Sequence, residues 1–266
     1  MRTTTVVRAA AGALGALCLL APHAARAGMF DAGLPPGWSC AGDCGTLGPD
    51  GAVTAAPLGG ERYAYITTLD GVAGNVLAGV EDQEPGYSGT TLRSPSFSTT
   101  ATGGLLEFHV NYVTSDGSNF MDYAWVRLLD ASGAPPGMLF SARTRGDGPT
   151  VPGLGMPAPQ ADIVPFPTPF FGGAPVWSPL ALSSGTCYEA GCGYTGWLHV
   201  VYAIPGAGDF RLEFGAVNWV DNEHHSGLAV DNVTLDGVTL AVPEPSSWAM
   251  LLAGLGVVAS ALRRRV

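Results

Sequence analysis

Alternation of apolar and polar side chains is the feature that most limits how residues 28–242 can fold. In segments 106–112 and 210–214, every second residue is apolar. A period of two places these side chains on one face of a strand. Nothing between residues 28 and 242 sustains the helical period of 3.6. Five further apolar segments complete the predicted set of strands: 62–67, 123–129, 138–142, 197–204 and 227–240.

Glycine and proline separate these segments. The chain of 266 residues contains 38 Gly and 21 Pro, and turn signals lie at 115–118, 132–137, 205–208 and 236–237. Many short strands with such turns predict one all-β domain, a β-sandwich, over residues 28–242. With 47% hydrophobic and only 13% charged residues, the composition argues against disorder.

One stretch of the domain departs from this pattern. Between residues 149 and 179, nine of 31 residues are proline, which excludes a helix or a central strand. Loops this long are either functional or disordered, so three readings stay open: an ordered cover over the sheets, a ligand lid, or a mobile linker. The aromatic side chains Phe166, Phe170, Phe171 and Trp177 favour packing over the sheets.

Residues 1–27 have the pattern of a secretory signal peptide. Arg2 and Arg8 precede an apolar run at residues 9–22, and Ala25-Arg26-Ala27 matches the small-x-small cleavage pattern. Cleavage is expected between Ala27 and Gly28. The alternative, a membrane anchor, is disfavoured because the apolar run is too short.

The C-terminal segment 243–266 has three parts in a fixed order. Pro243-Glu244-Pro245 comes first, the apolar run 248–262 follows, and Arg263, Arg264 and Arg265 come next. Fifteen residues make a helix of about 22 Å, short for a bilayer core of about 30 Å. Arginines at its tip would stay in the cytoplasm, so the domain would lie on the other side of the membrane.

This arrangement resembles the PEP-CTERM sorting signal. The resemblance implies that an exosortase of a Gram-negative bacterium recognises Pro243-Glu244-Pro245 and removes the short transmembrane helix 248–262 after a transient stay in the membrane. The protein would then be released or attached at the cell surface. The alternative is a plain anchor that is never cut.

The cysteines agree with export. Once Cys18 leaves with the signal peptide, Cys40, Cys44, Cys187 and Cys192 remain, an even number typical of disulfides in an oxidising compartment. Their spacings favour two local bridges, Cys40 with Cys44 and Cys187 with Cys192. The alternative is a four-cysteine zinc site, although the spacing differs from a two-residue knuckle.

The charge of the processed domain limits its partners. Residues 28–242 hold 6 arginines and no lysine against 21 acidic residues, a net charge of −15. Phosphate binding requires a basic footprint, so nucleic acid is excluded as a partner. Such a charge would also repel anionic polymers unless divalent cations bridge them.

Catalytic motifs do not occur in the sequence. It contains no Gly-x-Ser-x-Gly elbow, His-Glu-x-x-His or P-loop. Glycosidase chemistry would need two opposed carboxylates, for which the candidates are Glu107, Asp122, Glu213 and Asp221. His109 and His199 lie in predicted strands and are expected to be structural. The segment 221–225 is expected to be an exposed acidic loop rather than a metal site, and we do not expect an enzyme.

Three segments resemble secreted jelly-roll modules, including carbohydrate-binding modules and MAM-like domains: 29–38, 92–97 and 227–233. The resemblance implies a jelly-roll sandwich. In such folds an acidic residue near the first strand and one on the last strand often hold a structural calcium ion; here these would be Asp31 and Asp231. The alternative is a turn residue and a strand-end carboxylate. Aromatic residues in 193–197 and Trp219 could stack on sugars, but use in the core is favoured.

Together these observations predict an exported protein of the cell surface or extracellular matrix. We expect a structural or binding component, associated with biofilm or extracellular polysaccharide, with exosortase as its processing partner. The alternatives are a secreted glycan-active enzyme and a calcium-stabilised, lectin-like binding module.

Overall fold

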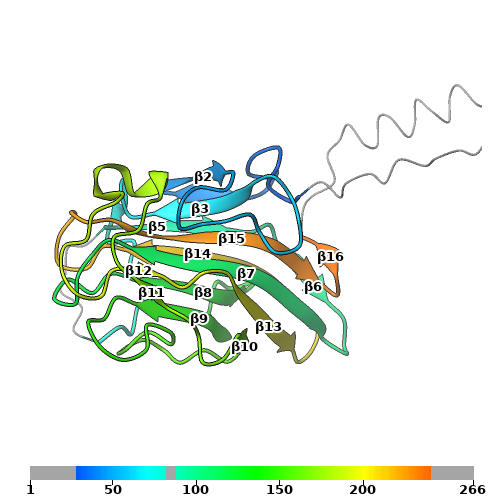
Figure 1. Cartoon of the computed structure of the whole chain (residues 1–266). Helices are drawn as coiled ribbons and strands as arrows, with labels where there is room; N and C mark the ends of the chain where they lie inside the picture. The colour runs from blue at the N-terminus through cyan, green and yellow to red at the C-terminus, as the bar shows by residue number, and fades with distance from the viewer. Residues whose placement is uncertain (1–27, 82–87, 241–266) are drawn as a thin grey trace, which may run out of the picture.

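The computed structural model describes residues 28–81 and 88–240, which form a sandwich of two antiparallel sheets (Figure 1). The signal peptide and the sorting tail lie outside the described residues. No helix within the described ranges is long and apolar enough to cross a bilayer. We name the two sheets after their central strands, the β7 sheet and the β14 sheet.

The β14 sheet has seven strands. They are β1 (Ser39–Ala41), β4 (Val72–Ala73), β5 (Ser88–Arg93), β6 (Phe97–Thr99), β8 (Tyr123–Asp130), β9 (Gly137–Arg143) and β14 (Gly208–Val217). The β7 sheet has nine strands. They are β2 (Asp43–Leu47), β3 (Tyr63–Thr67), β7 (Gly104–Thr114), β10 (Asp162–Val164), β11 (Phe171–Gly172), β12 (Gly193–Tyr194), β13 (Leu198–Ile204), β15 (Ser226–Leu235) and β16 (Val238–Thr239).

Eight of these strands carry the jelly-roll topology, and in chain order they are β3, β5, β7, β8, β9, β13, β14 and β15. In the β7 sheet the first, eighth, third and sixth lie side by side, as β3-β15-β7-β13; in the β14 sheet the second, seventh, fourth and fifth do, as β5-β14-β8-β9. This interleaving of the two sheets is the strand order of a jelly roll. The predicted fold class is therefore confirmed.

The core lies between the sheets and follows the predicted alternation. On β7, Phe108 and Val110 are fully buried against the other sheet, whose β14 supplies Leu212 and Phe214. Phe108 and Phe214 meet edge to face with ring centroids 5.7 Å apart. The side chains between them, such as Glu107 and Glu213, lie on the outer faces of the two sheets.

Each predicted strand is present, with one subdivision: segment 227–240 forms β15 and β16, joined by a turn at Asp236-Gly237. Six strands outside the Pro-rich stretch carry no clear hydrophobic signal and were not predicted: β1, β2, β4, β5, β6 and β12. In β5, Leu92 is the only large apolar side chain. Its neighbours β1 and β14 on the two sides hold it in place, which no local pattern reveals.

The Pro-rich stretch 149–179 is an ordered cover. It contains the edge strand β10 and the short β11, and a 3-10 helix, Ser178–Ser183, begins at its end, so the exclusion of helix fails for its last two residues. Trp177 is fully buried, as predicted, and its Nε1–H donates to Tyr63 Oη at 2.9 Å. Its phenylalanines contribute unequally: Phe166 is 85% exposed, whereas Phe171 is 51% exposed and stacks on Tyr194.

Both predicted disulfides are present, Cys40–Cys44 and Cys187–Cys192, and the zinc alternative is wrong because each sulfur is bonded to another. The first bridge links β1 in the β14 sheet to β2 in the β7 sheet. The chain changes sheet at Gly42, whose φ of 106° suits glycine. The bridge therefore closes the corner at which the two sheets join.

Candidate functional site

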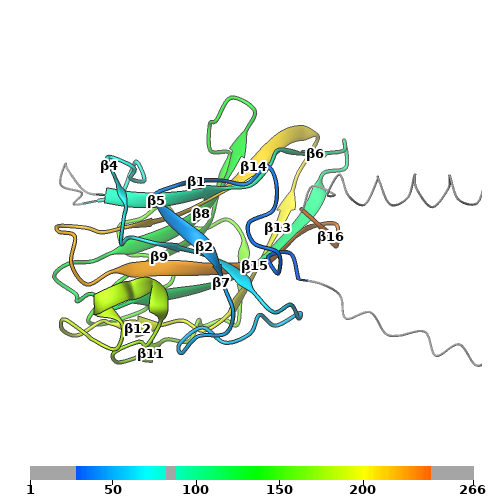
Figure 2. The same ribbon diagram turned by 90° about the horizontal axis from the view of Figure 1, so that it is seen from above.

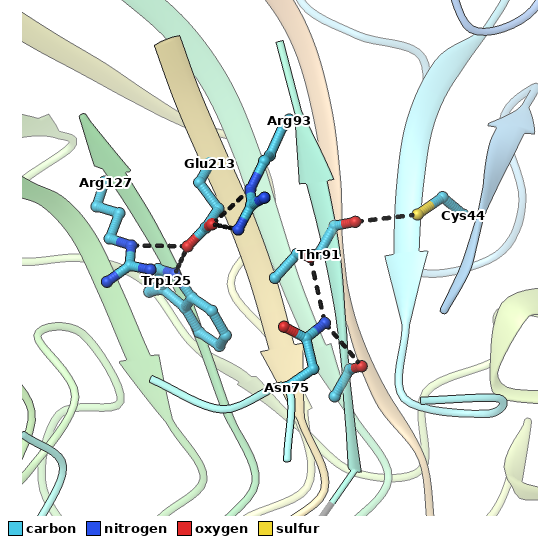
Figure 3. Close-up of polar contacts among 8 residues, drawn as sticks. Cys44, Asn75, Thr91, Arg93, Trp125, Arg127 and Glu213 are labelled. Carbon is cyan, nitrogen blue, oxygen red and sulfur yellow. Dashed lines mark hydrogen bonds and ion pairs between the residues drawn. The ribbon is translucent and has the colours of Figure 1, made fainter. Parts of the chain in front are cut away.

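A row of charged side chains crosses the outer face of the β14 sheet. Glu213 on β14 pairs in register with Arg93 on β5 and with Arg127 on β8. Outward-facing residues at paired positions lie beside one another on a sheet. Figure 3 shows the Glu213 carboxylate between the two guanidinium groups, with the Trp125 indole beneath. We call Arg93, Glu213 and Arg127 the charged row.

Glu213 is the fixed centre of this row. Its side chain is completely buried, whereas those of Arg93 and Arg127 are 46% and 21% exposed. Oε2 accepts from Arg93 Nη2 at 2.7 Å and Nε at 2.8 Å, and Oε1 accepts from Arg127 Nε at 2.6 Å (Figure 3). Trp125 Nε1 donates to Oε1 at 3.4 Å. Both carboxylate oxygens therefore already accept N–H groups of the neighbouring strands.

Arg127 also lines a surface hollow. The hollow has a volume of about 380 Å³ and is bounded by Arg127, Gln160 and the apolar side chains of Leu77, Met138 and Pro157. Arg127 binds Glu213 through its Nε. Its Nη1 and Nη2 atoms have no acceptor among residues 28–81 and 88–240. Two planar N–H groups therefore remain available beside the hollow, held in orientation by the bond to Glu213.

This face is locally cationic although the domain is acidic. Two arginines and one glutamate give the charged row a net charge of +1, and Arg211 lies two residues before Glu213 on the same face of β14. Arg93, Arg127 and Arg211 are half of the six arginines in residues 28–242. The sequence could not reveal this clustering, because these residues come from three strands that are distant along the chain.

The outer face of the β7 sheet holds the two strand histidines. His199 on β13 and His109 on β7 pair in register and stack, with ring centroids 4.6 Å apart and planes 10° apart. His199 Nε2 lies 3.3 Å from Glu107 Oε1. Burial, and then the neighbouring His199, lower the pKa of His109 to about 4. His109 is therefore neutral at physiological pH, in agreement with the predicted structural role.

Asp31 binds Gly28 near the start of the domain, and Asp231 lies on β15 in register with His109 at the middle of β7, close enough for the two carboxylates to interact. Partial burial acts to raise the pKa of Asp31. The N–H groups of Gly28, Glu61 and Arg62 donate to its carboxylate at 2.6–2.9 Å and outweigh this effect, so the pKa lies below its ordinary value. Burial raises the pKa of Asp231 to about 7, and the nearby Asp31 charge adds to this.

These two residues fit a calcium ion only in part. Oδ2 of Asp231 is buried without a hydrogen-bond partner among the described residues, which suits a cation. Both oxygens of Asp31, in contrast, already accept backbone N–H groups. No three His, Cys, Asp or Glu side chains in the described part of the chain lie close enough to hold a metal. Calcium at Asp31 and Asp231 stays a prediction.

The four candidate catalytic carboxylates do not gather at one site. Glu107 and Glu213 lie on the outer faces of opposite sheets, so they do not face one another across a groove. Asp122 is buried inside one end of the sandwich, where its charged neighbours are Asp221, the fourth candidate, and Asp116, which sequence reasoning missed. Asp116 lies in the segment 115–118, which has the composition of a turn and gave no other signal.

The aromatic side chains considered for sugar stacking are mostly covered by other groups. The guanidinium carbon of Arg143 lies 5.1 Å from the ring centre of Trp219. Tyr194 stacks on Phe171, with ring centroids 5.2 Å apart, and Trp197 packs edge to face against Tyr63. All three side chains are half-buried and pack against buried clusters of the sandwich.

Comparison with curated proteins gives no match. Among solved structures, the chain is similar to the K1 cleaved adhesin domain of Lys-gingipain from Porphyromonas gingivalis, with 12% identity, a TM-score of 0.37, and coverage of 77% of this chain and 94% of that one. Carbohydrate-binding modules of the β-sandwich superfamily give 11% identity and a TM-score of 0.31, covering 80% and 61%. An alginate lyase of polysaccharide lyase family 7 gives 13% and 0.31, covering 65% and 77%. These values are too low to transfer a ligand or an activity.

The C-terminal segment matches a family model. Residues 241–265 match the PEP-CTERM protein-sorting motif, and they include the Pro-Glu-Pro sequence, the apolar run and the arginine cluster of the tail. The match covers the tail and not the sandwich. The chain therefore carries a PEP-CTERM sorting motif behind a jelly-roll domain.

Proposed function

We propose that this protein is an exported binding module that is sorted to the cell surface through its tail and binds an acidic polysaccharide with the charged row. The PEP-CTERM motif supports export that depends on an exosortase. The end of the sandwich next to the tail holds Gly28 and Thr239. The outer face of the β14 sheet lies along the side of the domain (Figure 2), so it would stay accessible after attachment at that end.

The observation that carries the proposal is that Nη1 and Nη2 of Arg127, beside the hollow, have no hydrogen-bond acceptor among the described residues. A guanidinium offers a planar fork that matches a carboxylate in a bidentate way. Its Nε bond to Glu213 fixes the fork in advance, which lowers the entropy cost of binding. The hollow of about 380 Å³ is within the range of small-ligand sites, and Gln160 adds an amide at its rim.

An acidic ligand is compatible with the negative charge of the domain. Repulsion from distant carboxylates is screened over about 8 Å at physiological ionic strength, whereas the contact with Arg127 is direct. The long-range field would slow association. We therefore expect modest affinity that increases with added divalent cations, which screen the polymer.

Binding is favoured over catalysis because Glu213, the carboxylate on the proposed binding face, is already hydrogen-bonded to two arginines. Glu213 accepts from two guanidinium groups and an indole, so it is poorly suited to accept a proton from a substrate. A polysaccharide hydrolase needs a second carboxylate facing the first, and Glu107 lies on the other sheet.

The test is to replace Arg127 by glutamine and to measure binding of polygalacturonate, with dextran as a neutral polymer. Loss of hydrogen bonds to a charged group costs about 1.5–3 kcal/mol, so we expect binding of polygalacturonate to weaken about 10- to 100-fold. The control is Arg62→Gln, because Arg62 binds Thr46 at the edge of the β7 sheet. Equal binding of both polymers by the wild type, or equal losses in both variants, would refute the proposal.

Processing of the tail is tested separately by the intact mass of the exported protein. We expect a chain that begins at Gly28, lacks residues 248–266 and is lighter by about four hydrogens for its two disulfides. Additional mass at the new C-terminus would identify an anchor. A membrane-bound chain that keeps Arg263–Arg265 would mean that the tail is never cut.

A further inference from the structure

A buried group of oxygen atoms lies at the end of the sandwich opposite the tail. It is formed where four strands begin or end: Asp116 follows β7, Asp122 precedes β8, Asn218 follows β14 and Ser226 opens β15. We call these four residues the distal cluster. Two strands come from each sheet, so the cluster closes the interior at this end. Because β7 spans 11 residues at about 3.3 Å each, the cluster lies about 35 Å from the tail end (Figure 1).

All four side chains are buried, and their relative exposures are between 0% and 2%. Three of their oxygen atoms, Asp116 Oδ2, Asp122 Oδ2 and Asn218 Oδ1, have no hydrogen-bond partner among the described residues. Buried polar atoms almost always have a partner. Asp116 and Asp122 also lie within hydrogen-bond reach of one another, and Asp122 lies within reach of Ser226. Three acceptors without a donor in one place therefore point to a missing positive group, which is either a proton shared by the two carboxyl groups or a bound cation.

The positions of the side chains direct these atoms toward one another. Val217 and Tyr123 are paired in register and face outward. By strand alternation, the next pair, Asn218 and Asp122, faces inward. Trp219 N–H donates to Asp122 Oδ1 at 2.9 Å and Gly117 N–H donates to Asp116 Oδ1 at 2.7 Å. These bonds fix the two carboxylates and leave the second oxygen of each toward the interior.

Hydroxyl groups form the floor of the distal cluster. Ser226 Oγ and Thr114 Oγ1 are 2.8 Å apart, Thr114 and Thr144 are 2.8 Å apart, and Thr144 is 2.9 Å from Tyr112 Oη. The side-chain polar atoms of Ser226, Thr114, Thr144 and Tyr112 beside the cluster are therefore all hydroxyl oxygens. The network is anchored at Asp122, whose carbonyl accepts from Tyr112 Oη at 2.8 Å, and at Asp116, whose N–H donates to Thr114 Oγ1 at 3.2 Å.

Within residues 28–81 and 88–240, neither Asp116 nor Asp122 forms a salt bridge. The charged groups that act most strongly on Asp116 and Asp122 are each other, Asp221 and Glu189, all of them acidic. Burying a carboxylate without a counter-charge costs several kcal/mol. A bound cation would remove this cost and would also occupy the unpartnered oxygens.

We propose that the distal cluster binds a divalent cation, with calcium as the expected ion. The donors would be Asp116 Oδ2, Asp122 Oδ2, Asn218 Oδ1 and Ser226 Oγ, with water completing the shell. Calcium prefers such all-oxygen sites with flexible geometry, whereas magnesium requires a strict octahedron and retains its water. With only two carboxylates, the site belongs in the range of extracellular modules, with a Kd of about 10⁻⁴–10⁻³ M.

The experiment measures thermal and urea unfolding of the mature exported protein in 10 mM calcium and in chelator. For the proposed affinity, the unfolding equilibrium constant should fall about 10- to 100-fold with calcium. Magnesium at the same concentration should give less than half of this effect on a logarithmic scale. No response of the wild type to calcium would overturn the proposal.

Two matched variants locate the ion. Asp122→Asn keeps the shape of the side chain and removes its charge, so it should abolish the calcium response while leaving the protein at least as stable as the wild type in chelator. Asp231→Asn, whose side chain lies outside the cluster on the part of β15 that pairs with His109 at the middle of β7, should keep the response. If Asp231→Asn abolishes it and Asp122→Asn does not, the ion lies near Asp231 and the distal proposal is wrong.

Terbium luminescence provides a readout that does not depend on unfolding. Trp219 lies next to the cluster because its backbone N–H binds Asp122, so its indole should sensitise a bound terbium ion. We expect luminescence that calcium displaces, and about tenfold less of it in Asp122→Asn. Equal luminescence in the variant would contradict the assignment even if that variant unfolds more easily.

Discussion

Replacing Trp177 by alanine should lower the free energy of unfolding by about 3–5 kcal/mol, the usual cost of truncating a buried tryptophan. The ring is fully buried, packs edge to face against Tyr65 with centroids 6.2 Å apart, and donates to Tyr63 Oη. It also lies against Gly227, where an added Cβ would be 2.7 Å from the indole. Removing it leaves a cavity and a buried hydroxyl that has lost its donor.

Trp177 attaches the Pro-rich cover to the β7 sheet, so the loss should also loosen residues 149–179. Urea unfolding followed by circular dichroism measures the change in stability, and limited proteolysis detects the loosened cover. Phe166→Ala is the control, because that ring is 85% exposed, and it should change stability by less than about 0.5 kcal/mol. A loss below about 1 kcal/mol for Trp177→Ala would show that the cover does not depend on this side chain.

Replacing Glu213 by alanine should cost about 3 kcal/mol, the lower end of the range for breaking a buried ion pair. The carboxylate is fully buried, but its partners Arg93 and Arg127 reach solvent, so water can replace part of what they lose. The two guanidinium groups would then repel one another across the vacated position. Glu213→Gln should cost less, because the amide oxygen keeps one acceptor.

The control for this change is Asp209→Asn on the same strand, an exposed carboxylate that accepts from Ser98 Oγ at 2.6 Å. We expect a change of less than about 0.5 kcal/mol. Urea unfolding of the three variants in parallel measures the differences. If Glu213→Ala were as stable as Asp209→Asn, the charged row would contribute nothing to the sandwich.

Local chemistry explains why part of the fold could be predicted. The alternation in 106–112 and 210–214 reflects strands with one face in the core, and a period of two is visible in any short window. The disulfide pairing could be predicted because the partners are only four or five positions apart along the chain. For β5, the sequence Ser-Gly-Thr-Thr-Leu-Arg carries no such signal, and two neighbouring strands supply its hydrogen bonds.

Both candidate sites depend on residues that no local window brings together. Glu213 meets Arg93 from 120 residues away and Arg127 from 86 residues away. From the sequence, Asp116 lies in a predicted turn and Asp122 is a candidate catalytic acid. Only the folded sandwich buries both of them beside Asn218. Whether a carboxylate is paired, free or buried depends on its neighbours in space.

The sequence by itself determined the all-β class, the two disulfide bridges and the sorting motif, because each depends on residues that are close along the chain. Tertiary structure alone decided which charges meet. The jelly roll interleaves strands from both halves of the chain, so it pairs Glu213 with two arginines on one face and brings two aspartates together at the far end. Electrostatic energy depends on distance and burial, and both are properties of the folded sandwich rather than of the sequence order.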